Sequence, residues 1–367
     1  MNEHLAELIT RRQAVVLCGA GGVGKTSVSA AVAIAAARRG RRVLVVTIDP
    51  SRRLAELLGV SRNAPAPLPL AEEVTREMGI EPPGSLSAWM LDPKHVADST
   101  VRRLTRTPEE AERFIQNRIY ANVTQMMASM QEYSAVEAIY QFVTAGQYDL
   151  VVLDTPPSRN ALQFLEAPGR LRNFFDTRIF SLFLPGKTSR IRRAAQRLIY
   201  RIMDASLGKE SSAELQQFLN TFADIFLHLN DNAIKASDFF RQAEVAFLLV
   251  TSPAKEALEE AYYFEHKARD ELHCRLEGYI LNRSLGRLER AMPPDPRRVP
   301  GRDPVARAAL TKFAALAQSE QEQAERHRAL QAALQDRIGA EHSVIVLPFL
   351  HEGVTDLRSL AALAAAL

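Results

Sequence analysis

The sequence of 367 residues contains little cysteine, and Cys18 and Cys274 are the only two. They form no Cys-x-x-Cys pair and have no paired histidine spacing beside them, so neither a disulfide scaffold nor a structural zinc site is expected. A run of the roughly 18 apolar residues that a membrane span needs is missing, and the first residues lack the apolar core of a signal peptide. We therefore expect a cytoplasmic protein that is not integral to a membrane.

Net charge is also small, because 46 Lys and Arg residues oppose 43 Asp and Glu residues. This balance argues against a surface built for nucleic acid, so no nucleic-acid partner is expected. The segment from Arg170 to Arg201 is locally basic. A solvated helix face is the favoured interpretation of it, and peripheral contact with anionic lipid or an acidic partner is the alternative.

Short apolar runs, rich in β-branched residues, recur along the chain and predict buried strands. They are Val15–Cys18, Val43–Ile48, Leu86–Leu91, Leu150–Asp154, Val245–Thr251, Gly278–Asn282 and Val344–Leu347. The runs lack polar-apolar alternation, and long helical patterns separate them, which is typical of a parallel sheet covered on both faces. The sequence thus predicts a doubly wound, mostly parallel α/β fold.

A glycine-rich motif carries the strongest functional signal. The segment Gly19-Ala20-Gly21-Gly22-Val23-Gly24-Lys25-Thr26, followed by Ser27, matches G-x-x-x-x-G-K-[ST] between a strand pattern and an Ala-rich helical pattern. Its backbone N–H groups and the following helix N-terminus are expected to bind phosphates. Lys25 is expected to reach the β- and γ-phosphates, and the Thr26 hydroxyl to ligate Mg²⁺.

Two carboxylates end predicted strands, where side chains face the ligand crevice of such a sheet. Asp49 follows the run 43–48 and either positions or deprotonates an attacking water, as a catalytic residue would, or caps the next helix. Asp154 closes the run that begins at Leu150. We predict that it holds a Mg²⁺-bound water.

The interval between Asp154 and Val245 has about 90 residues without a strand pattern, far more than a crossover needs. Amphipathic helical patterns fill it. We predict an inserted helical subdomain over residues 171–242, between the two parts of a nucleotide-binding domain, 1–170 and 243–367. Its apolar residues form either the insertion's own core, which is the favoured interpretation, or a groove for a hydrophobic client.

Together these motifs resemble the arsenite-pump and tail-anchored-protein-targeting (ArsA/Get-type) ATPase family, with its bacterial members nearest. The matching segments run over essentially the whole chain and are Gly19–Thr26, Ile48–Leu54, Leu153–Leu162, Leu249–Pro253, Ile280–Arg283 and Leu347–Leu350. The resemblance implies a dimeric deviant P-loop ATPase of the SIMIBI type that uses ATP and Mg²⁺. In such dimers, two subunits face each other across sandwiched nucleotides.

The same resemblance implies residue roles that the spacing alone does not. Asn282, with its neighbour Arg283, would contact adenine, and the loop around Pro348 and Phe349 would cover the ring. In the targeting branch, helical subdomains of two subunits form an apolar groove for a client's transmembrane helix.

Departures from the family pattern limit what can be carried over. Ala20 stands where the deviant loop has a signature lysine that crosses the dimer. Hydrolysis is therefore slow, or uses another cation such as Arg52, Arg53 or Arg159, or depends on a lysine from a paralogous partner. With two cysteines in all, the chain has neither the zinc clasp of the eukaryotic dimer nor the thiolates that arsenite needs.

The sequence favours one interpretation over two rivals. The favoured interpretation is a Mg²⁺-dependent ATPase whose nucleotide-driven dimer opening and closing moves the helical subdomain, with the handling of a membrane-protein client as one use of this movement. The first rival is a catalytically weak nucleotide-binding subunit of a heterodimer. The second is a membrane- or DNA-associated positioning ATPase, which the long insertion disfavours.

Overall fold

The computed structural model describes residues 2–48, 53–61, 64–105, 107–117, 120, 131–156, 240–289 and 304–367, with scattered residues between 201 and 239. A single eight-stranded sheet forms the centre, with strand order β3-β4-β2-β5-β1-β6-β7-β8. The strands are β1 (Ala14–Gly19), β2 (Arg42–Thr47), β3 (Leu68–Pro69), β4 (Ser85–Met90), β5 (Leu150–Asp154), β6 (Val245–Thr251), β7 (Leu276–Ser284) and β8 (Ser343–Pro348).

Neighbouring strands are parallel throughout except at one edge, where β3 runs antiparallel to β4. The predicted strands all form within a residue or two of their expected bounds, so the predicted α/β sheet is confirmed. β3 was not expected, since it lies in a segment whose prolines favour a loop. Proline is tolerated there because an edge strand leaves some N–H groups unpaired.

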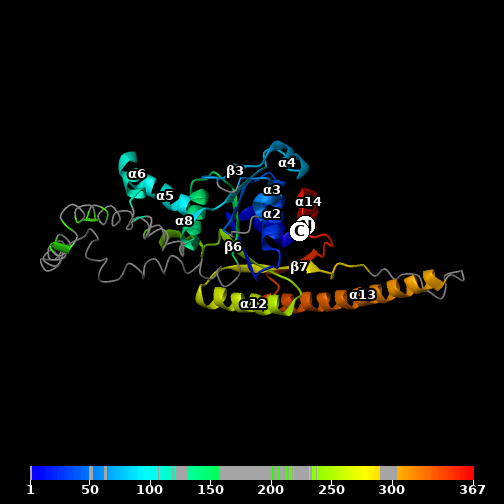
Figure 1. Cartoon of the computed structure of the whole chain (residues 1–367). Coiled ribbons are helices and arrows are strands. Elements are labelled where there is room, and N and C mark those ends of the chain that lie inside the picture. The colour runs from blue at the N-terminus through cyan, green and yellow to red at the C-terminus, as the bar shows by residue number, and fades with distance from the viewer. Residues whose placement is uncertain are drawn as a thin grey trace.

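Helices cover both faces of the sheet (Figure 1). Those described are α1 (Glu3–Arg11), α2 (Lys25–Ala37), α3 (Arg53–Leu58), α4 (Glu72–Glu77), α5 (Pro93–Leu104), α6 (Pro108–Ile115), α8 (Gln131–Thr144), α12 (Lys255–His266) with a π-helical turn (Lys267–Glu271), α13 (Pro304–Ile338) and α14 (Leu357–Ala366). In Figure 1, α12 and α13 lie on one side of the molecule, and α2 and α14 on the other.

Alternate residues of the strands point into two separate apolar clusters. Val15 and Leu17 of β1 pack on the side of α1, α2 and α14, whereas Val16 and Cys18 pack on the side of α8, α12 and α13. Burial on both faces explains why the strands read as continuous apolar runs.

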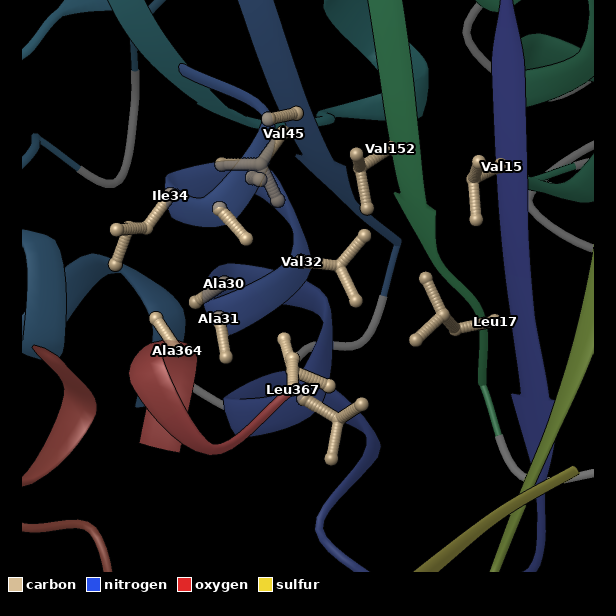
Figure 2. Packing of buried hydrophobic residues seen from close by; sticks show 14 of the residues in the cluster. Val15, Leu17, Ala30, Ala31, Val32, Ile34, Val45, Val152, Ala364 and Leu367 are labelled. Atoms are coloured by element: carbon tan, nitrogen blue, oxygen red, sulfur yellow. The ribbon is translucent and has the colours of Figure 1, made fainter. Parts of the chain in front are cut away.

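Helix α2 is the most deeply buried helix of the first face, and almost all of its residues are shielded from solvent. Its small side chains, among them Ala30 and Ala31, lie between the sheet and the C-terminal residues Ala364 and Leu367 (Figure 2). A helix that is apolar all round is expected to be enclosed in this way. This packing fixes the N-terminus of α2, which directly follows the glycine-rich loop.

Helix α13 is anchored to the sheet only along its second half. There Leu334 and Ile338 are buried, and the Nδ1 atom of His327 accepts a hydrogen bond of 3.0 Å from the Leu285 N–H, just beyond the end of β7. The first half extends past the sheet (Figure 1), and Phe313 is 63% exposed and Leu316 is 56% exposed. The described part of this helix begins at Pro304.

The predicted helical subdomain, 171–242, falls largely outside the described residues and stays a prediction. Among the described helices, none is long and apolar enough to cross a bilayer.

Candidate nucleotide site

The glycine-rich loop lies at the carboxyl end of the central strand β1, between β5 and β6. Gly19 pairs with Val250, and a Cβ atom at position 19 would lie 2.0 Å from the Val250 carbonyl oxygen. Gly24 has a φ of 89°, in the left-handed region, and a Cβ there would lie 2.5 Å from the Asn282 side-chain nitrogen. Both positions therefore require glycine.

Lys25 begins α2 and folds its side chain back over the loop. Its Nζ atom donates hydrogen bonds of 2.8 Å to the carbonyl oxygens of Gly19 and Ala20, and the residue is only 6% exposed. The loop thus holds one ammonium group within a cradle of backbone, at the positive end of the α2 dipole. Such an arrangement favours a polyanion.

Asp154, at the end of β5, is fully buried and accepts hydrogen bonds from hydroxyls on two other elements. Thr26 donates to Oδ2 at 2.7 Å and Thr47, the last residue of β2, donates to the same oxygen at 3.0 Å. Ser29 lies 3.4 Å from Oδ1. Charge-assisted bonds of this kind hold the carboxylate in one orientation.

These donors fit a magnesium ion. Mg²⁺ prefers oxygen ligands and keeps several of its waters, so it is usually bound through one or two protein oxygens plus phosphate. The Thr26 hydroxyl and the Asp154 carboxylate meet directly beside Lys25, where both a phosphate chain and the ion would be needed. The described residues thus bring together the Mg²⁺ and phosphate ligands expected from the sequence.

The residues expected around adenine also converge. Asn282 is buried in β7, and its Nδ2 atom donates to the Val23 carbonyl oxygen at 2.8 Å, which ties this strand to the phosphate loop. Ser284 is opposite Pro348 in the sheet, and the Ser284 carbonyl accepts a hydrogen bond from the Phe349 N–H. The Phe349 side chain is exposed.

Arg283 follows Asn282 with a φ of 56°, and its side chain points to solvent. Asn282, Arg283, Pro348 and Phe349 are therefore brought together at one end of β7 and β8, although they are separated by more than sixty residues of chain.

Some of the sequence-predicted residues cannot be placed. Asp49, Arg52 and Arg159 lie outside the described residues, as does the side chain of Arg53. Their predicted roles stay predictions. Ala20 is described, and its side chain is only 4% exposed within the apolar cluster of the α2 face.

Sequence reasoning missed the hydroxyl groups of Thr47 and Ser29. A signal for Thr47 exists, because it ends a strand two residues before Asp49, as Asp154 ends another. The sequence does not show which strands are neighbours, and this information was needed to place Thr47. Only when β2 is known to pair with β5 does Thr47 stand opposite Asp154.

A parallel sheet, a glycine-rich loop at the end of its central strand, and a following helix that carries Lys25 and Thr26 define the P-loop nucleotide-binding class. The family model described as anion-transporting ATPase matches residues 12–267. The chain therefore belongs to this family of P-loop ATPases.

Individual relatives are distant. An arsenical pump-driving ATPase of Escherichia coli is 27% identical over 168 residues, which cover 43% of this chain and 26% of that protein. An ATPase ASNA1 homolog of Leishmania braziliensis is 30% identical over 206 residues, which cover half of each chain. The matched part thus spans half or less of these relatives' length.

Proposed function

We propose that this chain hydrolyses ATP to ADP and phosphate in a Mg²⁺-dependent reaction. The observation that carries the proposal is the convergence of Lys25, Thr26 and Asp154 at one end of the sheet. Membership of an ATPase family supports the same activity. On ATP binding, Lys25 would exchange its hydrogen bonds with the loop carbonyls for phosphate oxygens.

In the proposed reaction, water attacks the γ-phosphorus in line with the leaving β-phosphate oxygen. Asp49 is assigned to position this water, and Lys25 to stabilise negative charge on the γ-phosphoryl oxygens. Thr26, and Asp154 through a water, would hold the Mg²⁺ ion, which supplies further charge neutralisation when bound. Loop N–H groups from Gly21 to Thr26 would bind the phosphate chain.

The proposal includes a dimer whose nucleotide state moves the helical subdomain 171–242, with a hydrophobic helix or membrane protein as client. It is supported by the family membership and by the apolar patterns of that segment. We propose a cytoplasmic location, with peripheral contact at the membrane as an extension. A membrane- or DNA-associated positioning ATPase remains the less favoured alternative.

A second candidate function rests on Ala20. This position carries no cation. In the second candidate function, the chain is a weakly active subunit that forms a heterodimer and uses a lysine from a paralogue. Light scattering distinguishes the two candidate functions, because only a self-sufficient ATPase is expected to dimerise in ATP without a paralogue.

Steady-state phosphate release by the purified chain, with molar mass recorded in ADP and in ATP, tests the proposed activity. We expect Mg²⁺-dependent turnover, a dimer in ATP, and loss of turnover in Asp49→Asn, because an amide cannot accept a proton from the attacking water and polarises it less than a carboxylate does. Turnover equal to wild type in Asp49→Asn would remove Asp49 from the reaction. Absence of nucleotide binding would overturn the function itself.

Asn282→Ala is expected to weaken ATP binding about three- to tenfold, the value of one neutral hydrogen bond. Tripolyphosphate has no base and serves as the matched ligand. If Asn282 recognises adenine, as we propose, its loss weakens ATP and leaves tripolyphosphate unchanged. If the affinities for ATP and for tripolyphosphate fell equally, Asn282 would instead act by supporting the phosphate loop through its hydrogen bond to Val23. Titration calorimetry measures both affinities.

A further inference from the structure

Two histidines and a glutamate meet at the end of the sheet where β7 and β8 begin, opposite the end that carries the nucleotide site. His4 lies in the first turn of α1, Glu277 lies near the start of β7, and His342 directly precedes β8. One ligand atom from each of the three residues lies within 4.8 Å of the other two. The strand pairing explains part of this meeting, because Gly278 and Ser343, the next residues along, are partners in the sheet.

One hydrogen bond sets the tautomer of a neutral His4 ring. Its Nε2 atom lies 2.9 Å from the Glu277 carbonyl oxygen. A carbonyl oxygen only accepts, so Nε2 carries the proton, and the lone pair of a neutral ring is on Nδ1. Metal-binding histidines commonly have their second nitrogen fixed by a backbone carbonyl in this way.

His342 has an unsatisfied nitrogen. Its Nδ1 atom is buried and has no hydrogen-bond partner within the part of the chain that the structure describes. The Glu277 Oε2 atom is 3.7 Å away, too far for a hydrogen bond. Around a tetrahedral zinc ion, ligand atoms are separated by about 3.3 Å, so small side-chain rotations would bring both atoms into contact with one ion.

The backbone near His342 and the start of α1 are both well anchored. Gln335 donates from Nε2 to the His342 carbonyl at 2.7 Å and accepts from the Val344 N–H at 3.1 Å. Leu5 and Ile9 of α1 are buried in the apolar cluster of the α2 face. Ligands on rigid elements lose little entropy on binding, while the 25% exposed His342 side chain gives an ion access from solvent.

Two guanidinium groups contact the other oxygen of the same carboxylate. Arg12 donates to Glu277 Oε1 at 2.9 Å, and Arg275 lies 3.5 Å from it. The hydrogen bond from Arg12 would orient the ligating carboxylate, whose Oε2 atom lies on the side of His342, whereas Arg275 makes only an ion-pair contact. Their charge opposes a cation, so the affinity should increase when one of them is neutralised.

We propose that His4, Glu277 and His342 bind a divalent transition-metal ion, with Zn²⁺ as the reference, and that the ion ties α1 to β7 and β8. Two imidazoles and one carboxylate suit zinc, cobalt and nickel, whereas magnesium prefers oxygen ligands alone. The site lies outside the assigned nucleotide machinery and does not depend on the proposed ATPase activity.

Thiol groups should not obscure the measurement. Burial raises the pKa of both Cys18 and Cys274 to about 12, so neither is a thiolate at neutral pH. The protein would be purified without a histidine tag, treated with chelator, and titrated with ZnCl₂ in excess Mg²⁺, which is expected to occupy the proposed Thr26 and Asp154 site. Co²⁺ absorption spectra then report the ligand geometry.

We expect one equivalent of Zn²⁺ per chain, a higher thermal midpoint with zinc, and affinity at least about tenfold lower in His342→Ala. His266→Ala is the matched control, because His266 also pairs with a carboxylate, Asp270, but on the exposed side of α12. Arg275→Gln should bind zinc more tightly than wild type, and it keeps the proposal testable if His342→Ala fails to fold.

No saturable zinc binding by the wild-type chain would overturn the proposal. Equal zinc affinities of wild type and a folded His342→Ala would do so as well, since they would place the ion elsewhere. Equal affinities of wild type and Arg275→Gln would contradict Glu277 as a ligand.

Discussion

Replacing Lys25 with alanine is expected to reduce steady-state ATP hydrolysis by about 10²–10³-fold, the usual cost of removing one preorganised donor from a charged transition state. The side chain is buried at the mouth of the loop and holds the only ammonium group that the glycine-rich motif supplies. Its loss should also weaken the binding of ATP. Phosphate release at saturating ATP and calorimetric ATP affinity separate the two effects.

The Lys25→Ala variant needs a folding control, because its ammonium group satisfies the carbonyls of Gly19 and Ala20. Near-ultraviolet circular dichroism and the thermal midpoint provide it. Lys255→Ala is the matched substitution, since Lys255 also starts a helix but is 83% exposed in its side chain. Hydrolysis by folded Lys25→Ala within a few-fold of wild type would contradict the assigned role.

If the chain depends on a partner's lysine, as in the second candidate function, introducing a lysine at Ala20 is expected to raise ATP hydrolysis by the purified chain by about 10³-fold or more, the contribution of comparable cations supplied to phosphoryl transfer from a partner. The gain depends on a second copy of the chain, so specific activity should rise with protein concentration. Phosphate release over a dilution series, with light scattering at each concentration, measures it.

Burial of Ala20 makes a steric control necessary. The alanine side chain lies in the apolar cluster of the α2 face, so a long substituent must direct its stem out of that cluster. Ala20→Met adds similar length without charge. If Ala20→Lys and Ala20→Met change activity equally, the effect is one of packing. If Ala20→Met is neutral and Ala20→Lys gives no gain, the wild-type chain already uses another cation.

The phosphate end of the candidate site could be predicted from local sequence, since its residues lie in a contiguous motif. Lys25 and Thr26 follow the glycines directly, and Asp154 ends an apolar run that only a buried strand explains. The strands themselves were equally readable, because burial on both faces leaves no polar residues to interrupt them. These signals depend on neighbours in the chain.

What the sequence could not provide is contact between distant segments. The bond between Thr47 and Asp154 requires β2 beside β5, and the bond from Asn282 to Val23 requires β7 near the loop. His4 and His342 are 338 positions apart and meet because α1 packs at the edge where β8 begins. Strand order decides the first two contacts and the packing of a helix on the sheet decides the third, and neither has a local signature.

The half-anchored helix α13 has a mechanical consequence. Its anchored part begins near Ala324 and His327, beside the β7 end that carries Asn282 and Arg283, so this point would act as the pivot of the free half. The twenty or so residues before the pivot span about 30 Å at 1.5 Å per residue, so a tilt of about 10° at the pivot sweeps the tip through about 5 Å. A displacement too small to change any strand pairing would thus be magnified at the exposed side chains of Phe313 and Leu316.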